Sequence, residues 1–226
     1  FDSSANINYF LVGEADAQAL QNLNPALQAH FIRHPHYDLC GGKAGIMPDG
    51  EKIRILIAGR YDYYMQQDGD LLVDALCQNA SLSADYTITV LGKGWEANVD
   101  RLRSAGYQIE HITFAPNYIE EISKHDIQIT PISIGTGTKG KVLDALANGL
   151  LVVGTWWALE NIAVKDGESC VEYSDIDKLI DVLREIPVQR DRYRAIAQRG
   201  QENVLNEHGA RKIAKGFFEM FDSLSS

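Results

Sequence analysis

Residues 131–155 read PISIGTGTKGKVLDALANGLLVVGT, and the stretch IGTGTKGKV at 134–142 decides how the chain is interpreted. It matches both G-x-G-x-x-G, the dinucleotide fingerprint, and G-x-x-x-x-G-K, the pattern of a P-loop. The fingerprint normally follows the first strand of its domain, and an acid ends the next strand. Here the motif follows the fourth predicted strand of the domain whose first strand begins at Ile53, and no acid follows the next strand until Glu160. A P-loop needs a hydroxyl where Val142 stands, so neither motif applies.

The stretch still predicts an anion site. Its glycine-rich turn leads into a predicted helix, Lys139–Asn148, so free backbone N–H groups and the positive end of the helix dipole face the strand ends. Lys139 and Lys141 add positive charge. Together these groups suit a phosphate or a diphosphate. The motif alone leaves one alternative open, which is a plain glycine-rich helix start with two solvated lysines.

Hydrophobic patterns on both sides of this stretch alternate between strands and helices. The predicted strands are Ile7–Val12, His30–Arg33, Ile53–Ala58, Thr87–Leu91, Gln108–Phe114, Ile127–Pro131, Leu151–Gly154 and Cys170–Tyr173. The predicted helices are Glu14–Leu23, Leu71–Asn79, Trp95–Ala105, Tyr118–Lys124, Lys139–Asn148, Ile176–Arg184, Arg192–Asn206 and Ala210–Leu224. Strands separated by single helices imply right-handed crossovers and a mostly parallel sheet. The sequence therefore predicts an α/β fold, a Rossmann-like parallel β/α/β sandwich preceded by a short β-α-β unit.

The chain divides at one segment that lacks hydrophobic periodicity. Residues 37–50, YDLCGGKAGIMPDG, are rich in glycine and read as a linker. We expect residues 1–36 to belong to a first unit, 51–208 to form the large β/α domain, and 209–226 to form a C-terminal helix that can cross back to the first unit. Because the chain begins with Phe1 rather than Met, we expect it to be a fragment of a longer protein.

Composition excludes several classes of function. The 226 residues carry a net charge of −10, which argues against electrostatic capture of nucleic acid or of an anionic membrane. The cysteines, Cys40, Cys77 and Cys170, lie far apart, a pattern typical of reduced thiols in a cytoplasmic protein without a zinc site. The longest apolar run, Leu150–Leu159, is too short to span a bilayer.

The segment 131–155 resembles the donor-site segment of GT-B glycosyltransferases, especially family 4 of the retaining enzymes and its group 1 relatives. The family pattern runs P-x-x-x-G-x-G-x-K-x-K-x-L-E-A-x-A-x-G-x-P-V-V-x-T. Matching positions are Pro131, Gly135, Gly137, Lys139, Lys141, Leu143, Ala145, Ala147, Gly149, Val152, Val153 and Thr155. The resemblance extends to ILIAGR at 55–60 and to VKDGESCVEYSDIDKLIDVLREI at 164–186. It implies a C-terminal, donor-binding domain preceded by the end of an acceptor domain in residues 1–36.

The resemblance also implies where a diphosphate lies. It places the diphosphate against Gly59, Arg60, Gly137, Thr138, Lys139 and Lys141. Arg60 and Lys141 are the expected catalytic residues, since they would stabilise the departing diphosphate. Side chains two residues apart on a helix diverge by about 200°, so only one lysine can face the ligand. We favour Lys141, because it lies three residues before Asp144 and therefore on the same helix face.

Other implied contacts involve the nucleoside and the sugar. Asp144 stands where the family has a glutamate that binds the ribose hydroxyls, and the loop that contains Asn117 and Tyr118 is expected to border the nucleobase. Thr136, also expected at the donor site, replaces a family glutamate that touches the sugar. Asp68 stands where many members have a lysine. Both departures put catalysis in question.

The implied activity is a hexosyltransferase-type glycosyltransferase of polysaccharide biosynthesis, acting with retention. It would move a sugar from a nucleotide-sugar donor to a glycan or lipid-linked acceptor held by a preceding N-terminal domain. We expect no cofactor, no metal and no nucleic-acid partner. We also expect a peripheral membrane association for the full-length enzyme, and donor binding without sugar transfer by this chain alone. The alternative is a non-catalytic GT-B partner subunit or nucleotide-binding module.

Overall fold

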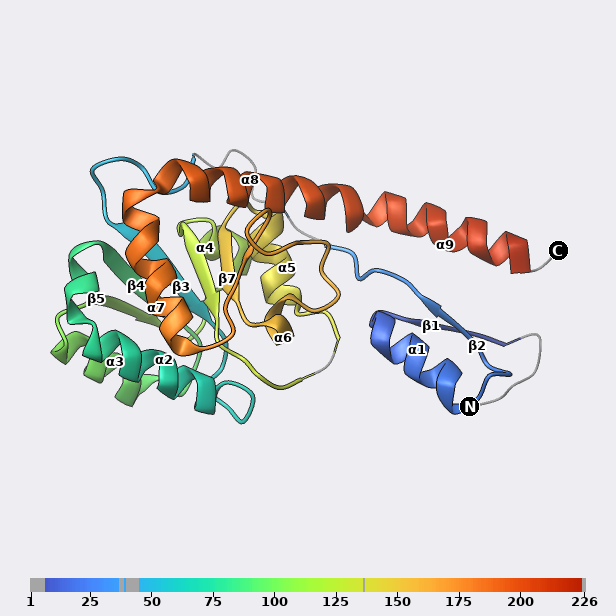
Figure 1. Ribbon diagram of the computed structural model, residues 1–226, viewed down its shortest axis with the longest axis horizontal. Coiled ribbons are helices and arrows are strands. Elements are labelled where there is room, and N and C mark those ends of the chain that lie inside the picture. The colour runs from blue at the N-terminus through green and yellow to red at the C-terminus, as the bar shows by residue number, and fades with distance from the viewer. Residues whose placement is uncertain (1–6, 37–38, 40–44, 136, 225–226) are drawn as a thin grey trace.

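The computed structural model describes residues 7–36, 39, 45–135 and 137–224, and these form two parallel sheets (Figure 1). One sheet has two strands and belongs to a small unit, and the other has six strands and forms the core of the large domain. The predicted α/β class with a parallel sheet is confirmed. Thr136 of the predicted site and most of residues 37–44 in the predicted linker lie outside the described residues.

The large sheet reverses its strand order at its centre. Its order is β5-β4-β3-β6-β7-β8, and every neighbouring pair is parallel. The strands are β3 (Ile53–Ala58), β4 (Tyr86–Leu91), β5 (Gln108–Ile112), β6 (Ile127–Thr130), β7 (Leu151–Gly154) and β8 (Val171–Glu172). The chain winds outward from β3 in one direction and from β6 in the other. In open parallel sheets the crevice at such a reversal, outside the carboxyl ends of the strands, is the usual ligand site.

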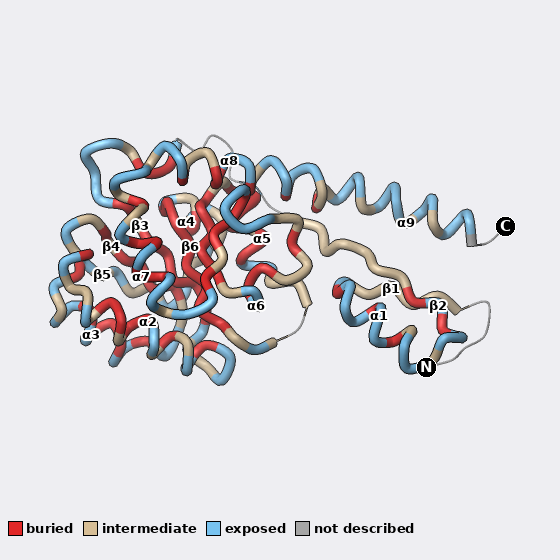
Figure 2. The backbone as a smooth tube through the Cα atoms, in the orientation of Figure 1, coloured by how far each residue is buried: buried red, intermediate tan, exposed pale blue. Residues whose placement is uncertain are grey.

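Helices and short 3₁₀ segments connect these strands. They are α2 (Gln66–Gln78), η1 (Ala80–Ala84), α3 (Glu96–Ser104), α4 (Tyr118–Ile122), α5 (Gly140–Ala147), α6 (Trp156–Leu159), α7 (Ile176–Glu185), η2 (Ile186–Val188) and α8 (Arg190–Glu207). The strands β3, β6 and β7 lie at the centre of the buried core (Figure 2). Val142, Leu143 and Leu146 of α5 are buried, so this helix presents an apolar face to the core.

The small unit consists of β1 (Asn8–Leu11), α1 (Glu14–Leu23) and β2 (Gln28–Phe31), with β1 and β2 parallel. Its core is limited to Leu20, Leu27 and Ala29, with a few half-buried neighbours. The C-terminal helix α9 (Ala210–Leu224) runs from the end of α8 to this unit (Figure 1). The rings of Phe217 on α9 and Phe10 on β1 meet with centroids 4.8 Å apart.

One buried histidine joins the small unit, the α8–α9 junction and the large domain. The imidazole of His208 is fully buried. Its Nδ1 lies 2.7 Å from the carbonyl oxygen of His34, and its Nε2 accepts the backbone N–H of Ala163 at 3.0 Å. The ring is therefore neutral, with its proton on Nδ1. Burial lowers the pKa of His208 below its usual value.

Several expected boundaries are wrong, each for an identifiable reason. Helix α2 begins at Gln66, five residues before the predicted start, because Gly69 fits under the Trp95 ring and is tolerated inside the helix. Strand β2 is Gln28–Phe31 rather than 30–33, because pairing with β1 sets its register. The short helix α6 was not predicted. Within the described ranges no helix combines the length and apolarity needed to cross a membrane.

Candidate functional site

Two segments lie at the point where the strand order of the large sheet reverses, between β3 and β6. Gly59 and Arg60 follow β3, and residues 131–139 follow β6, the strand that pairs with β3. The Gly59 backbone is fixed, because its N–H donates to Leu91 O at 3.0 Å and its carbonyl accepts Trp95 Nε1–H at 2.9 Å. Arg60 is exposed, and its guanidinium has no hydrogen bond or ion pair with any described residue. Its charge is therefore available to a ligand above the strand ends.

The glycine-rich turn depends on backbone conformations that favour glycine. Gly135 has φ +115° and Gly137 has φ +72°, in the region that side-chain-bearing residues rarely adopt. The turn is anchored on two sides. Ser133 Oγ donates to Asp68 Oδ2 on α2 at 2.7 Å, and Thr138 Oγ1 lies 3.5 Å from the Val12 carbonyl of the small unit. Asp68, at the position where the resemblance suggested a lysine in many members, therefore supports the turn through a hydrogen bond and supplies no cation.

The two candidate lysines differ sharply in environment. Lys139 keeps only 17% of its side chain exposed. Its Nζ donates to Gly137 O at 2.7 Å and lies 3.7 Å from Glu160 Oε2. Burial lowers the pKa of Lys139 below its usual value, and the charges of Glu160 and Asp16 offset part of that shift. Lys141 is exposed, and its ammonium has no partner among the described residues.

The predicted helix start at Lys139 is wrong, because α5 begins at Gly140. Lys139 is the residue before the helix and has an extended backbone, with φ −84° and ψ 98°. The angle of about 200° between side chains two apart on a helix therefore does not apply to Lys139. The preference for Lys141 stays a prediction, and the enclosed position beside the turn belongs to Lys139.

The predicted nucleoside contacts lie on α5 and α4. Asp144 is half-buried on α5, and its charge acts on the phenol of Tyr118 at the start of α4. Burial, with a smaller contribution from Asp144, raises the pKa of Tyr118 well above its usual value. The Tyr118 hydroxyl is buried without a hydrogen-bond partner in the described part of the chain. Asn117 caps α4, since its Oδ1 accepts the N–H of Glu120 at 3.1 Å. Asn117 is thus held by the helix start, which leaves its backbone as its contribution to a ligand.

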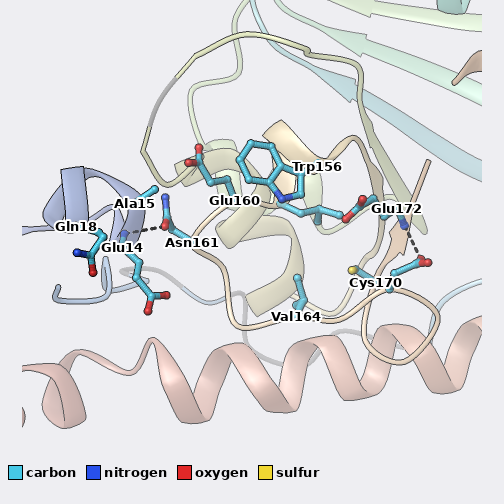
Figure 3. A pocket seen from close by; sticks show the side chains of 11 residues that line it. Glu14, Ala15, Gln18, Trp156, Glu160, Asn161, Val164, Cys170 and Glu172 are labelled. Atoms are coloured by element: carbon cyan, nitrogen blue, oxygen red, sulfur yellow. Dashed lines mark hydrogen bonds between the residues drawn. The ribbon is translucent and has the colours of Figure 1, made fainter. Parts of the chain in front are cut away.

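A cavity lies beside this site, between α1 and the segment that follows β7 (Figure 3). Its volume is about 510 Å³. Its lining combines an indole, two amides, four carboxylates and apolar groups but no lysine or arginine: Glu14, Ala15, Gln18, Trp156, Leu159, Glu160, Asn161, Val164, Asp166, Cys170 and Glu172. An aromatic face with hydrogen-bonding carboxylates suits an uncharged polyol and disfavours an anion. This cavity is therefore not a second diphosphate site.

Glu160 and Asn161 connect the cavity, the turn and the small unit, and sequence reasoning missed both. Asn161 has φ +63°, and its Oδ1 accepts the N–H of Glu14 at the start of α1, at 3.1 Å. Glu160 lines the cavity and also pairs with Lys139. The one signal in the sequence was that Glu160 is the first acid after β7. Across the described ranges, no group of three or more His, Cys, Asp or Glu side chains could hold a metal ion.

Three solved structures share this fold at low identity. HepE of Anabaena, in complex with UDP, is 14% identical with a TM-score of 0.75, over 96% of this chain and 64% of HepE. TarM of S. aureus, in complex with fondaparinux, alpha-GlcNAc-glycerol and UDP, is 10% identical with a TM-score of 0.74, over 95% of this chain and 43% of TarM. The C-terminal domain of LpcC, a glycosyl transferase group 1 family protein of Francisella tularensis, is 19% identical with a TM-score of 0.59, over 92% of this chain and 98% of that domain.

These likenesses establish the fold, and the chain spans less than two thirds of the length of HepE. No curated protein matches the sequence. The family comes from the sequence itself, because a family model described as "Glycosyl transferase-like" matches residues 69–219, well over half of the chain. That span contains the glycine-rich turn, both lysines and Asp144. The chain therefore belongs to the glycosyl transferase-like family, and it has the GT-B fold that its sequence predicts.

Proposed function

We propose that this chain is the donor-binding part of a retaining glycosyltransferase that moves a hexosyl group from a nucleotide-sugar to a glycan or lipid-linked acceptor. One observation carries the proposal. The guanidinium of Arg60, which has no partner among the described residues, and the glycine-rich turn with Lys139 stand at the carboxyl ends of the paired strands β3 and β6, where the strand order of the sheet reverses. Adjacent strands lie about 5 Å apart, which suits two groups that bind one diphosphate.

Each group has a distinct role in this proposal. The Arg60 guanidinium binds phosphate oxygens through its forked N–H groups, and the N–H groups of Gly137 and Thr138 bind the same anion at the start of α5. Lys139 or Lys141 supplies the second cation. As the bond to the sugar breaks, these groups stabilise the negative charge that develops on the departing diphosphate. Asp144 accepts hydrogen bonds from the ribose hydroxyls.

The fold relatives suggest the nucleotide to test first. HepE was crystallised with UDP and with UDP-glucose, and TarM was crystallised with UDP. We therefore propose UDP as the first probe. We further propose that the acceptor is bound mainly by a part of the protein outside this chain, so that the isolated chain binds donor without transferring sugar. In this proposal the enzyme acts in the cytoplasm, with a peripheral membrane association of the full-length protein, and it needs no metal.

One observation favours a second candidate, a non-catalytic nucleotide-binding partner of a GT-B enzyme. Asp68 stands where many relatives have a lysine, and it is engaged by Ser133 at 2.7 Å. The site therefore has one cation fewer for the diphosphate than those relatives have. A protein that kept donor binding but lost turnover would show this pattern.

The experiment is thermal unfolding of the chain with UDP, GDP, ADP and CDP, with the matching nucleosides as controls. A nucleoside diphosphate present at about 100 times its Kd stabilises the fold by about 2.7 kcal/mol. We expect such a shift with one nucleoside diphosphate and a smaller shift with its nucleoside. Absence of any shift at millimolar nucleotide would contradict the donor-site proposal.

A further inference from the structure

The ion pair between Lys139 and Glu160 lies at the edge of the glycine-rich turn and largely out of solvent. The two side chains are 17% and 13% exposed, and Nζ and Oε2 are 3.7 Å apart. Lys139 follows β6 and Glu160 follows β7, the next strand of the sheet. We propose that Glu160 is a positioning residue for the donor diphosphate: its carboxylate holds the Lys139 ammonium, charged, beside the turn. This inference rests on the proposed donor site.

The position of Lys139 explains why a carboxylate is needed there. Burial away from water destabilises the charged form of an ammonium group, and a nearby opposite charge stabilises that form again. The described charged groups that act on Lys139 are Glu160, from the C-terminal end of α6, and Asp16, from α1. The carbonyl of Gly137, at 2.7 Å, accepts one N–H and directs the ammonium toward the turn. Lys141, by contrast, is exposed and needs no such support.

The backbone around Glu160 is itself fixed on both sides. Thr155 caps α6, since its Oγ1 accepts the N–H of Ala158 at 3.3 Å, and it also donates to the Ile132 carbonyl in the turn after β6. On the other side, Asn161 accepts the N–H of Glu14 through Oδ1. Figure 3 shows Glu160 between α1 and Trp156, at the edge of the cavity. The backbone that carries the Glu160 carboxylate is therefore held by the large domain and by α1 together. Its Oε2 has no hydrogen-bond partner in the described part of the chain, so the ion pair with Lys139 is its polar contact there.

The proposed role of Glu160 differs from that of the family glutamate, which touches the sugar. The Glu160 carboxylate pairs with Lys139, so it acts on the diphosphate through that lysine and does not replace the acid that is missing at position 136.

The test measures the affinity for UDP by isothermal titration calorimetry between pH 7 and pH 9.5. If UDP gives no thermal shift, the nucleoside diphosphate with the largest shift is used. The variants are Glu160→Gln, which removes the charge, and Glu160→Asp, which keeps it. The Lys139→Ala variant lacks the ammonium, so the pH dependence of its UDP affinity shows how much comes from titration of the nucleotide itself. Glu168→Gln is the matched control, because Glu168 is an exposed acid of the same segment that pairs with Lys165.

We expect the Glu160→Gln variant to lose about tenfold more affinity than the parent over this pH range, because Lys139 loses its proton at a lower pH. Glu160→Asp should restore most of the parent profile, and Glu168→Gln should follow the parent throughout. Equal profiles for Glu160→Gln and the parent would overturn the inference. If Glu160→Gln fails to unfold cooperatively, Glu160→Ala replaces it, because alanine also removes the charge; a parent-like profile for that variant would overturn the inference.

Failure of the inference is distinguishable from failure of the proposed function. If the parent binds no nucleoside diphosphate, the donor site is absent and both proposals fall. If Lys139→Ala binds like the parent while Asp144→Asn binds more weakly, the donor site stands and the role of Lys139 falls, together with that of Glu160.

Discussion

Replacement of Asp126 by alanine should destabilise the large domain far more than loss of an ordinary ion pair. Asp126 precedes β6 and is fully buried. Its carboxylate accepts the backbone N–H groups of Met47 and Arg54, both at 2.8 Å, and a two-pronged contact from the Arg54 guanidinium at 2.7 and 2.9 Å. The residue therefore ties β6 to β3 at the end of the sheet opposite the candidate site.

The size of the effect follows from these partners. Alanine leaves two backbone N–H groups near the core without an acceptor, at about 1–3 kcal/mol each. Arg54 keeps 41% of its side chain exposed, so water can solvate much of its guanidinium and its share of the loss is small. We expect a decrease of about 3–5 kcal/mol in the free energy of unfolding, as for other broken buried pairs.

Urea denaturation of the parent and of two variants measures this difference. Asp74→Ala is the matched control, because Asp74 forms an ion pair with Arg101 in which both side chains are about half exposed. Pairs of that kind contribute about 0–1 kcal/mol. A loss below about 1 kcal/mol for Asp126→Ala, equal to that of the control, would refute the reasoning, because the buried N–H groups would then have found other acceptors.

Two further predictions concern binding and pH. Asp144→Asn should weaken both nucleoside and nucleotide by about 1–3 kcal/mol in calorimetry, whereas Lys139→Ala or Lys141→Ala should weaken only the diphosphate. Parent-like binding by all three variants would place the ligand elsewhere. The buried His208 keeps its neutral form because Nε2 accepts the N–H of Ala163. Its pKa lies below the unfolded value near 6.5, so stability should be intact above that pH and fall as the pH decreases below it. A His208→Asn variant that loses stability over the same pH range as the parent would assign that loss to another group.

The sequence predicted the parts of the fold that follow from local patterns. The strands Ile53–Ala58 and Leu151–Gly154 were predicted to the residue, because continuous apolar runs mark strands covered on both faces. The end of β5 was placed two residues too late, since the strand stops at Ile112 where its pairing with β4 ends. The sequence of a segment alone does not determine a strand boundary that depends on pairing with another strand.

The candidate site, like the fold, has one part that local sequence predicts and another part that tertiary packing sets. A glycine-rich turn after a strand and before a helix predicts an anion site from local sequence alone, and the reversal of strand order places that turn beside Gly59 and Arg60. The partners of its polar groups come from distant segments. Asp68 meets Ser133, and Glu160 meets Lys139, through tertiary packing that no local spacing encodes.

The residue at which α5 begins decides how the two lysines are placed relative to the turn. Helical geometry relates side chains only after the helix has begun, and α5 begins one residue after Lys139. Lys139 therefore turns toward Gly137 and Glu160, while Lys141 projects from the first turn into solvent. A cation held beside the turn loses less side-chain entropy when it binds a phosphate than a cation on a free side chain does. On this physical ground Lys139 should contribute more than Lys141 to diphosphate affinity, which reverses the order that sequence spacing favoured.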